Sequence, residues 1–172
     1  IMNKEVIMKN LISPLVLIVG MVVLLGSCAK KDDSTAATTA TAFTPTTTAS
    51  GSITVGSATM SGTYASDCSD MTGSSAIGTY IPSDVLANRD VLVVTGSDNV
   101  SEEMYLYTDT SCTNLSGYLK DGNDNFTVGD ASGEYYKVTY VEATFKVMAV
   151  TSTAESFYES YFSTNNITNQ GT

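Results

Sequence analysis

The hydrophobic pattern divides the chain into an apolar segment near its start, a polar stretch and a long region with strand-like alternation. Residues 11–25 form an apolar run, whereas residues 29–50 are mostly Thr, Ala and Ser and have neither a helical nor a strand period. From residue 51 onward, short alternating runs recur between turn-forming residues. The pattern predicts one β-rich domain over residues 51–172, which is large enough for a single core.

Seven or eight strands are expected in this domain. The run 100–108 places Val100, Met104 and Leu106 on one face and Tyr105 and Tyr107 on the other, because side chains alternate along a strand. Residues 121–124, with the sequence Asp-Gly-Asn-Asp, are interpreted as a hairpin turn. The expected strands are Ser52–Val55, Thr59–Ala65, Gly78–Ile81, Val91–Thr95, Val100–Thr108, Leu115–Lys120, Asn125–Val128 and Glu134–Val150.

The last of these strands contains a change of phase. Tyr136, Val138 and Tyr140 share one parity, whereas the apolar residues from Ala143 to Ala149 share the other. A shift by one residue moves every side chain to the opposite face. A bulge near Val141–Glu142 is favoured over a tight turn, because no Gly, Asn or Asp is available there.

One helix is expected after the last strand. Ser152 and Glu155 have the spacing of a capping box. The aromatic residues that follow recur at helical spacing, which predicts a helix packed against a sheet; they are Phe157, Tyr158, Tyr161 and Phe162. The predicted fold class is therefore all-β, as a closed antiparallel barrel with a short C-terminal helix or, alternatively, a β-sandwich.

The segment before the domain has the order of an export signal. A short cationic start at Met8-Lys9-Asn10 precedes the apolar run Leu11–Leu25, which ends in Leu25-Gly26-Ser27-Cys28. Fifteen helical residues span roughly 22 Å, too little for a hydrocarbon layer of about 30 Å. The final four residues resemble a bacterial lipobox. Residues 1–27 are thus expected to be a signal peptide, with translation starting at Met8 and residues 1–7 untranslated.

This resemblance implies that Cys28 becomes the lipidated first residue of a bacterial lipoprotein. Because one fatty chain holds a protein only reversibly, two or three acyl chains are used for a stable anchor. Ala29, and not aspartate, follows Cys28, which in related lipoproteins favours release to the outer membrane; a periplasmic and a surface-facing position both fit. Residues 28–50 are expected to be a disordered linker between the acyl chains and the domain.

Charge and cysteine content narrow the possible partners. After the signal, the chain keeps six basic and seventeen acidic residues, a net charge of −11 that disfavours nucleic acid and anionic lipid headgroups. Besides Cys28, the chain has Cys68 and Cys112. Two thiols in an exported chain are expected to form one disulfide, and neither a CxxC pair nor a metal-binding set with histidine is present.

Residues for catalysis or for a cofactor are lacking. The chain has no histidine, so the usual general base and the commonest transition-metal ligand are missing. Asp121, Asn123 and Asn125 have the spacing that opens a calcium loop, but Phe126 and Ser132 stand where glycine and glutamate are needed. The adjacent carboxylates at 102 and 103 are interpreted as solvated charges. We expect no enzyme activity, no cofactor and no metal.

A second resemblance concerns the domain. Gly62-Thr63-Tyr64 resembles the Gly-x-Trp motif of lipocalins with tyrosine in place of tryptophan, and the helix after the last strand is similar to theirs. Residues 107–113 and 66–68 resemble segments of small bacterial lipoproteins of unknown function. A lipocalin-like barrel implies a small apolar ligand, and the tyrosines expected to line its site are Tyr105, Tyr107, Tyr136 and Tyr140. The alternative is a structural or surface-interaction module with a filled core, meeting an envelope protein.

Overall fold

The computed structural model describes residues 3–6, 45–133 and 135–167. The expected signal peptide from Met8, the lipobox and Cys28 lie outside the described residues. The described part is mostly antiparallel β-sheet with one short helix, so the predicted all-β class is confirmed. None of its helices is long and apolar enough to cross a membrane.

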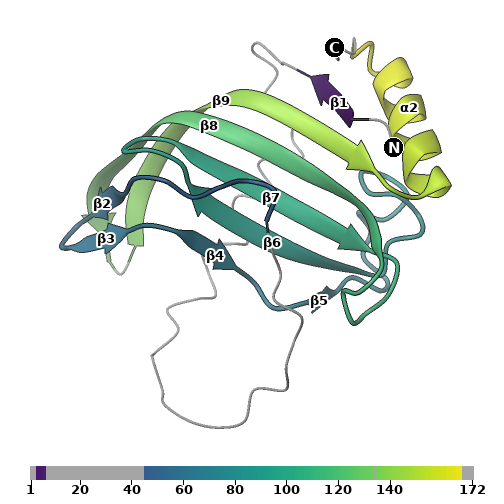
Figure 1. Ribbon diagram of the computed structural model, residues 1–172, viewed down its shortest axis with the longest axis horizontal. Helices are drawn as coiled ribbons and strands as arrows, with labels where there is room; N and C mark the ends of the chain where they lie inside the picture. Colours follow the sequence, from purple (N-terminus) through teal and green to yellow (C-terminus); the bar gives the residue numbers. More distant parts are fainter. Residues whose placement is uncertain (1–2, 7–44, 134, 168–172) are drawn as a thin grey trace, which may run out of the picture.

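One large sheet organises the domain (Figure 1). Its strands follow the order β1-β9-β8-β7-β6-β4. The short strand β5 pairs with another part of the same strand, β6. All of these pairs are antiparallel, and the sheet is not closed. The strands are β1 Asn3–Val6, β4 Thr63–Ala65, β5 Ser69–Asp70, β6 Ala87–Val94, β7 Val100–Tyr107, β8 Leu115–Ser132 and β9 Tyr135–Ala149. A separate hairpin consists of β2 Ile53–Val55 and β3 Ala58–Met60.

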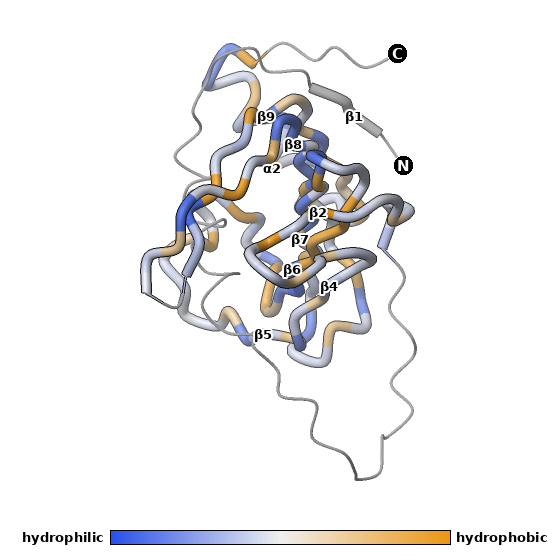
Figure 2. Tube along the Cα trace, turned by 90° about the vertical axis from the view of Figure 1, so that its left-hand side faces the viewer, coloured by the Kyte–Doolittle hydropathy of each residue, from blue (hydrophilic) through white to orange (hydrophobic). Residues whose placement is uncertain are grey.

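The sheet has two covered faces, and the alternation of side chains assigns residues to each. We call the helix face the one that carries Val94, Val100 and Leu106, and the disulfide face the one that carries Tyr105 and Tyr107. The predicted division of β7 between these faces is confirmed. On the helix face, Val94 and Val100 pack with Ile53 of the β2–β3 hairpin. Figure 2 shows hydrophobic stretches of the chain gathered around β6 and β7.

Helix α2, Ser152–Thr164, covers one end of the helix face (Figure 1). Tyr158 and Phe162 are buried against Phe145 and Val147 of β9, with Phe157 and Tyr161 partly buried beside them. The predicted packing of the aromatic stripe against a sheet is confirmed. The N-cap is Thr151, one residue before the expected Ser152, because the Thr151 hydroxyl accepts a hydrogen bond from the Ala154 amide at 3.1 Å.

The predicted hairpin turn at residues 121–124 is wrong. Strand β8 continues through these residues to Ser132, and the chain turns at Gly133, whose φ is +65°. Gly122 instead allows close approach of the neighbouring strand, since a Cβ there would collide with the Thr144 hydroxyl. The Asp-Gly-Asn-Asp sequence therefore belongs to an irregular strand rather than to its end.

The predicted bulge in the last strand is confirmed. Gly122 pairs with Thr144 and Asn123 with Glu142, which leaves Ala143 as the extra residue of β9. The bulge lies one residue beyond the expected Val141–Glu142. Two further irregularities fall on β8, between Asp124 and Thr127 and between Val128 and Ala131. Pairing of β8 with β9 resumes after each irregularity and continues to Ser132 and Tyr135. Each extra residue reverses the face on which the following side chains of its strand lie.

The early strands are shorter than expected. The run Thr59–Ala65 is split into β3 and β4 at Gly62, where φ is +84°. Residues 78–81 form no named strand and contribute only a bridge between Ile77 and Ile81. Loop residues 71–86 instead place Ile81 and Val85 against Leu106 on the helix face.

Residues 45–50, which the sequence assigns to the linker, lie along the disulfide face. The Ser50 amide donates to the Val94 carbonyl at 2.8 Å, and Ala49 packs on the apolar cluster that includes Tyr105 and Tyr107. Strand β1 pairs with residues 145–148 of β9 and precedes the expected cleavage site. The mature protein that the sequence predicts would therefore carry β9 at the edge of its sheet.

Packing on the helix face predicts the response to truncation. The Leu106 side chain is fully buried, so Leu106→Ala should lower the free energy of unfolding by about 2–5 kcal/mol. Leu86→Ala is the matched control, because Leu86 is 39% exposed and its truncation should cost much less. Urea unfolding of both variants measures the difference. Equal losses would contradict the assignment of Leu106 to the core.

Candidate functional site

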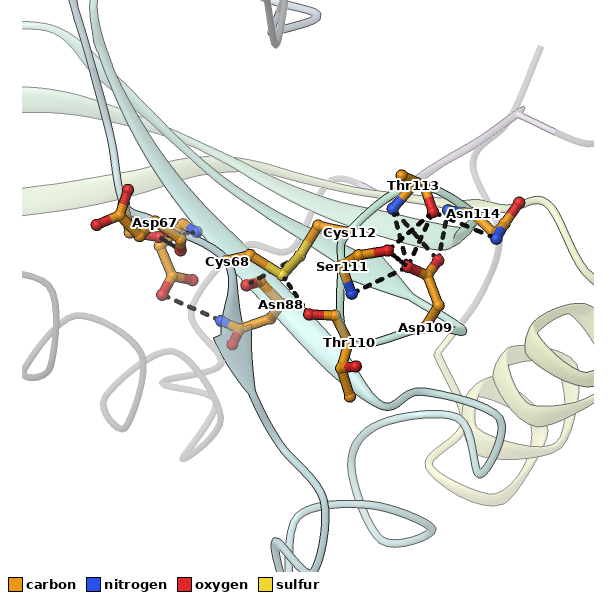
Figure 3. Close-up of a disulfide and its surroundings, with 11 residues drawn as sticks. Asp67, Cys68, Asn88, Asp109, Thr110, Ser111, Cys112, Thr113 and Asn114 are labelled. Atoms are coloured by element: carbon orange, nitrogen blue, oxygen red, sulfur yellow. Dashed lines mark hydrogen bonds between the residues drawn. A yellow bond between two sulfur atoms is a disulfide. The ribbon is translucent and has the colours of Figure 1, made fainter. Parts of the chain in front are cut away.

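The predicted disulfide is present between Cys68 and Cys112 (Figure 3). It joins the segment between β4 and β5 to the β7–β8 loop, with the two Cα atoms 5.9 Å apart. The cysteines are 44 residues apart in the chain, and closing such a loop stabilises a fold by about 4 kcal/mol in the chain-entropy model. The bridge thereby fastens one edge of the sheet to its interior strands.

Asp109 organises the loop that presents Cys112. Its carboxylate accepts hydrogen bonds from Ser111, from Thr113 and from the Asn114 amide at 2.6 Å. These bonds, with that of the Ser111 hydroxyl foremost, hold the pKa of Asp109 well below its usual range. Figure 3 shows them converging on Asp109 beside the disulfide. The loop is a structural support, and its polar groups are occupied by one another.

Tyr105 and Tyr107 are buried on the disulfide face, at 4% and 5% exposure. The Tyr105 hydroxyl donates to the Glu103 carboxylate, which also accepts from the Thr46 hydroxyl at 3.0 Å and lies 3.6 Å from the Lys120 amine. Burial raises the pKa of Glu103, but hydrogen bonds from Thr47, Tyr105 and Thr46 outweigh it and hold the pKa below its ordinary value. Residues 45–50 and the disulfide loop thus occupy the space over these two tyrosines.

Tyr136 and Tyr140 lie elsewhere, on β9 at the N-terminal side of the bulge. Tyr140 stacks on Phe126, with ring centroids 6.3 Å apart. Tyr136 is 41% exposed, and its hydroxyl lies so close to Gly56 in the β2–β3 turn that a Cβ there would collide with it. The structure therefore brings Tyr136 and Tyr140 to one strand but does not place the four predicted tyrosines on one face.

A group of carboxylates occupies the middle of the helix face. Glu102 of β7 pairs in register with Asp121 of β8, and Asn123 of β8 pairs with Glu142 of β9. Asp90 of β6 alternates onto the same face. We call Asp90, Glu102, Asp121, Asn123 and Glu142 the acidic cluster. It lies between the apolar cluster under α2 and the one under the β2–β3 hairpin.

The sequence interpretation of Glu102 and Glu103 as solvated charges is wrong, although their placement on opposite faces is confirmed. Glu103 is 2% exposed on the disulfide face, where Lys120 and hydroxyl groups surround it. Glu102 is partly buried on the helix face. Adjacent carboxylates on a covered sheet enter two different interiors, because both faces of this sheet are packed.

Charges are segregated between the two faces. The basic residues of β6 to β9 alternate onto the disulfide face; they are Arg89, Lys120, Lys137 and Lys146. Burial, together with the charges of Glu142 and Glu102, raises the pKa of Asp121 to about 8. Burial also raises the pKa values of Glu102, Asp90 and Glu142, helped at Glu102 by the charge of Asp90. The helix face thus concentrates negative charge away from those basic side chains.

Polar atoms of the acidic cluster lack hydrogen-bond partners. Asn123 is 1% exposed, and neither its Oδ1 nor its Nδ2 is hydrogen-bonded. Asp90 Oδ1, Asp121 Oδ1 and Glu142 Oε1 are buried and unpaired as well. A buried polar group without a partner costs about 1–3 kcal/mol, so native structures seldom leave one without a reason. The sequence contained one sign of this site, the alternate spacing of Asp121 and Asn123, but assigned it to a turn.

The donor atoms of the acidic cluster are oxygens, which suit hard cations and amines rather than soft metals. Among the described residues, no group of three or more His, Cys, Asp or Glu side chains is arranged to hold a metal ion. Any ion here would need the Asn123 amide oxygen together with at most two carboxylates in its immediate shell. As described, the cluster offers binding groups and no nucleophile paired with a base.

Compared with protein-family models, with curated proteins and with solved structures, the chain matches none of them.

The raised pKa of Asp121 predicts a pH-dependent effect of its replacement. The folded state favours the protonated form of Asp121. The contribution of this group to the free energy of unfolding is therefore greatest at low pH and declines as pH rises from about 4 toward about 8. Glu142 and Glu102 face this position and oppose its ionisation, and Asp90 and Tyr140 lie on the same face of the sheet. Asp121→Asn stays neutral, so in chelator its Tm should exceed that of the unmodified chain increasingly as pH rises.

Thermal unfolding at about pH 5 and about pH 8.5 measures this difference. Asp130→Asn is the control, because Asp130 is exposed on the same strand and should show no such trend. A Tm difference for Asp121→Asn that stays constant between the two pH values would contradict the raised pKa.

Proposed function

We propose that this chain is an exported lipoprotein, held at the bacterial outer membrane by acyl chains on Cys28, whose β-domain is a non-enzymatic binding module. The order of cationic start, apolar run and Leu-Gly-Ser-Cys supports the anchor. The Thr-, Ala- and Ser-rich composition of the residues after Cys28 supports a linker between the acyl chains and the domain.

The observation that carries the binding function is Asn123. Its amide is 1% exposed and has no hydrogen-bond partner, in a cluster where three carboxylate oxygens are also buried and unpaired. Packing alone would favour an apolar side chain at this position, since an unpaired amide is a net cost. A bound ligand that pairs with these atoms would offset that cost, and binding sites are where such groups are retained.

The apolar ligand that the lipocalin resemblance implies would contact the aromatic residues beside the cluster, namely the stacked Phe126 and Tyr140. The open sheet gives such a ligand less enclosure than a closed barrel would. A lipocalin-like interior therefore enters the proposal only as the region around this aromatic pair. The acidic cluster indicates that a ligand with positive charge fits the helix face better than a purely apolar one.

A second function is favoured by the exposed apolar side chains of the β8–β9 hairpin. Tyr135 and Val141 are each 57% exposed, and they share one face of β9. Exposed aromatic and apolar side chains on one face are typical of protein contact surfaces. Contact with an envelope protein through this hairpin is the alternative role, and it does not require an occupied interior.

The anchor predicts a specific loss of acylation. Cys28→Ala should abolish incorporation of labelled palmitate and leave an unprocessed chain, because the thiol is the acceptor of the diacylglyceryl group in lipoproteins. Electrophoresis of labelled cells measures both effects. Cys68→Ala together with Cys112→Ala is the control, since it removes the other cysteines and should keep the label. Continued labelling of Cys28→Ala would overturn the anchor.

The binding function predicts a bound species in the isolated protein. The full-length chain, extracted in a non-ionic detergent without chelator, should show a non-covalent mass adduct in native mass spectrometry. Asn123→Leu keeps a side chain branched at Cγ but removes the amide, so it should reduce that adduct while Asp130→Asn retains it. Absence of any adduct from the unmodified chain would contradict the binding function and leave the contact surface as the better proposal.

A further inference from the structure

We propose that the acidic cluster binds one calcium ion, with Asn123 Oδ1 and the carboxylates of Asp121 and Glu142 as ligands and Glu102 as an additional neighbouring charge. This inference rests on the proposed binding function and names its ligand. The site is formed by paired strands rather than by a loop.

The register of the sheet brings these groups together. Asp121 and Asn123 share the helix face because they are two residues apart on β8. Glu142 stands opposite Asn123 on β9, and Glu102 stands opposite Asp121 on β7. Side chains directly opposite each other on antiparallel strands have Cβ atoms about 4.5–5.5 Å apart. Asn123 and Glu142 have this separation, whereas Asp121 is a diagonal neighbour of Glu142, at about 7–8 Å, which is within reach of the longer glutamate side chain. Calcium would take their oxygens at about 2.3–2.6 Å.

The unpaired atoms indicate a cation rather than water. The unpaired atoms of the cluster are one carboxylate oxygen each of Asp90, Asp121 and Glu142 and both amide atoms of Asn123. All of them except Asn123 Nδ2 are acceptors when the carboxyl groups are ionised. A water molecule supplies two hydrogens, enough for two of these oxygens, and brings no positive charge. A divalent cation coordinates the oxygens of Asp121, Asn123 and Glu142 and also balances the carboxylates, which no basic side chain of β6 to β9 approaches on this face.

The kind of site favours calcium over other ions. All donors are oxygens, with no imidazole or thiolate, which disfavours zinc and copper. Asn123 is 1% exposed, and magnesium gives up its water shell reluctantly, so a dry site suits it poorly. Calcium accepts six to eight oxygens in flexible geometry, which fits ligands of unequal length on two strands.

Terbium luminescence tests the site directly. Tb³⁺ replaces calcium in oxygen sites and emits when a nearby tyrosine absorbs light, and this chain contains no tryptophan to interfere. Tyr140 is the expected sensitiser, because it lies two residues from Glu142 on β9 and therefore on the same face of the sheet. The full-length chain in non-ionic detergent should show saturable emission that Ca²⁺ reverses and Mg²⁺ does not. Tyr140→Phe should lower the emission while keeping Ca²⁺ affinity.

Removal of ligands should weaken calcium binding. Asn123→Leu, Asp121→Asn and Glu142→Gln should each reduce Ca²⁺ affinity by at least about tenfold, since even partners behind a metal ligand cost that much. Asp130→Asn, exposed on the same strand, should leave affinity unchanged. Because a variant could fail to fold, the rise in Tm of the unmodified chain on adding Ca²⁺ is measured as well, and it should be absent with Mg²⁺.

The results separate this inference from the function on which it rests. No saturable terbium emission and no calcium-dependent rise in Tm in the unmodified chain would overturn the calcium site. So would an Asp130→Asn variant that loses as much affinity as Asp121→Asn. If native mass spectrometry then shows an organic adduct sensitive to Asn123→Leu, the binding function stands with another ligand. If it shows no adduct, both fall.

Discussion

The pairing of β8 with β9, and the bulge at Ala143 within it, determines which side chains enter which interior. On the C-terminal side of the bulge, Phe145 and Val147 face α2 and form the core beneath it. On its N-terminal side the alternation is shifted by one residue, so Glu142 and Tyr140 lie on the same face of the sheet as Phe145. Without the extra residue, Ala143 and Val141 would occupy the helix face, and Glu142 would face the disulfide side. One inserted residue therefore turns the middle of an apolar face into a polar one.

Both faces of the sheet are packed at β6 and β7, so the surroundings of a buried charge depend on the face that its side chain enters. Glu103 has hydroxyl donors from Thr46 and Tyr105 and an amine from Lys120, so its charge is compensated within the fold. Glu102, its neighbour in the chain, has the carboxylates of Asp121 and Asp90 near it instead. The same residue type is thus stabilised on one side and left in an unfavourable field on the other. The contrast is why the helix face, rather than the tyrosine-rich disulfide face, carries the proposal of a bound cation.

Different elements cover the two ends of the helix face (Figure 1). Helix α2 and the loop 71–86 cover the helix face at one end, and the β2–β3 hairpin covers it at the other. On the opposite face, residues 45–50 and the disulfide hold Tyr105 and Tyr107 in place. The chain that leaves residue 45 toward Cys28 therefore starts from the disulfide face. A ligand on the helix face would meet the domain on the side away from that start.

Local periodicity determined much of the fold. The alternation in β7, the phase change in β9, the aromatic stripe of α2 and the pairing of Cys68 with Cys112 were all evident in the order of residues, because each depends on neighbours in the chain or on two thiols alone. Tertiary structure decided the rest. Asp121–Asp124 resembles a turn locally, yet pairing with both β7 and β9 keeps it extended, because the hydrogen bonds of two neighbouring strands outweigh a local preference. The acidic cluster was hidden for the same reason: its members lie on four strands, and only the register of those strands brings them to one face.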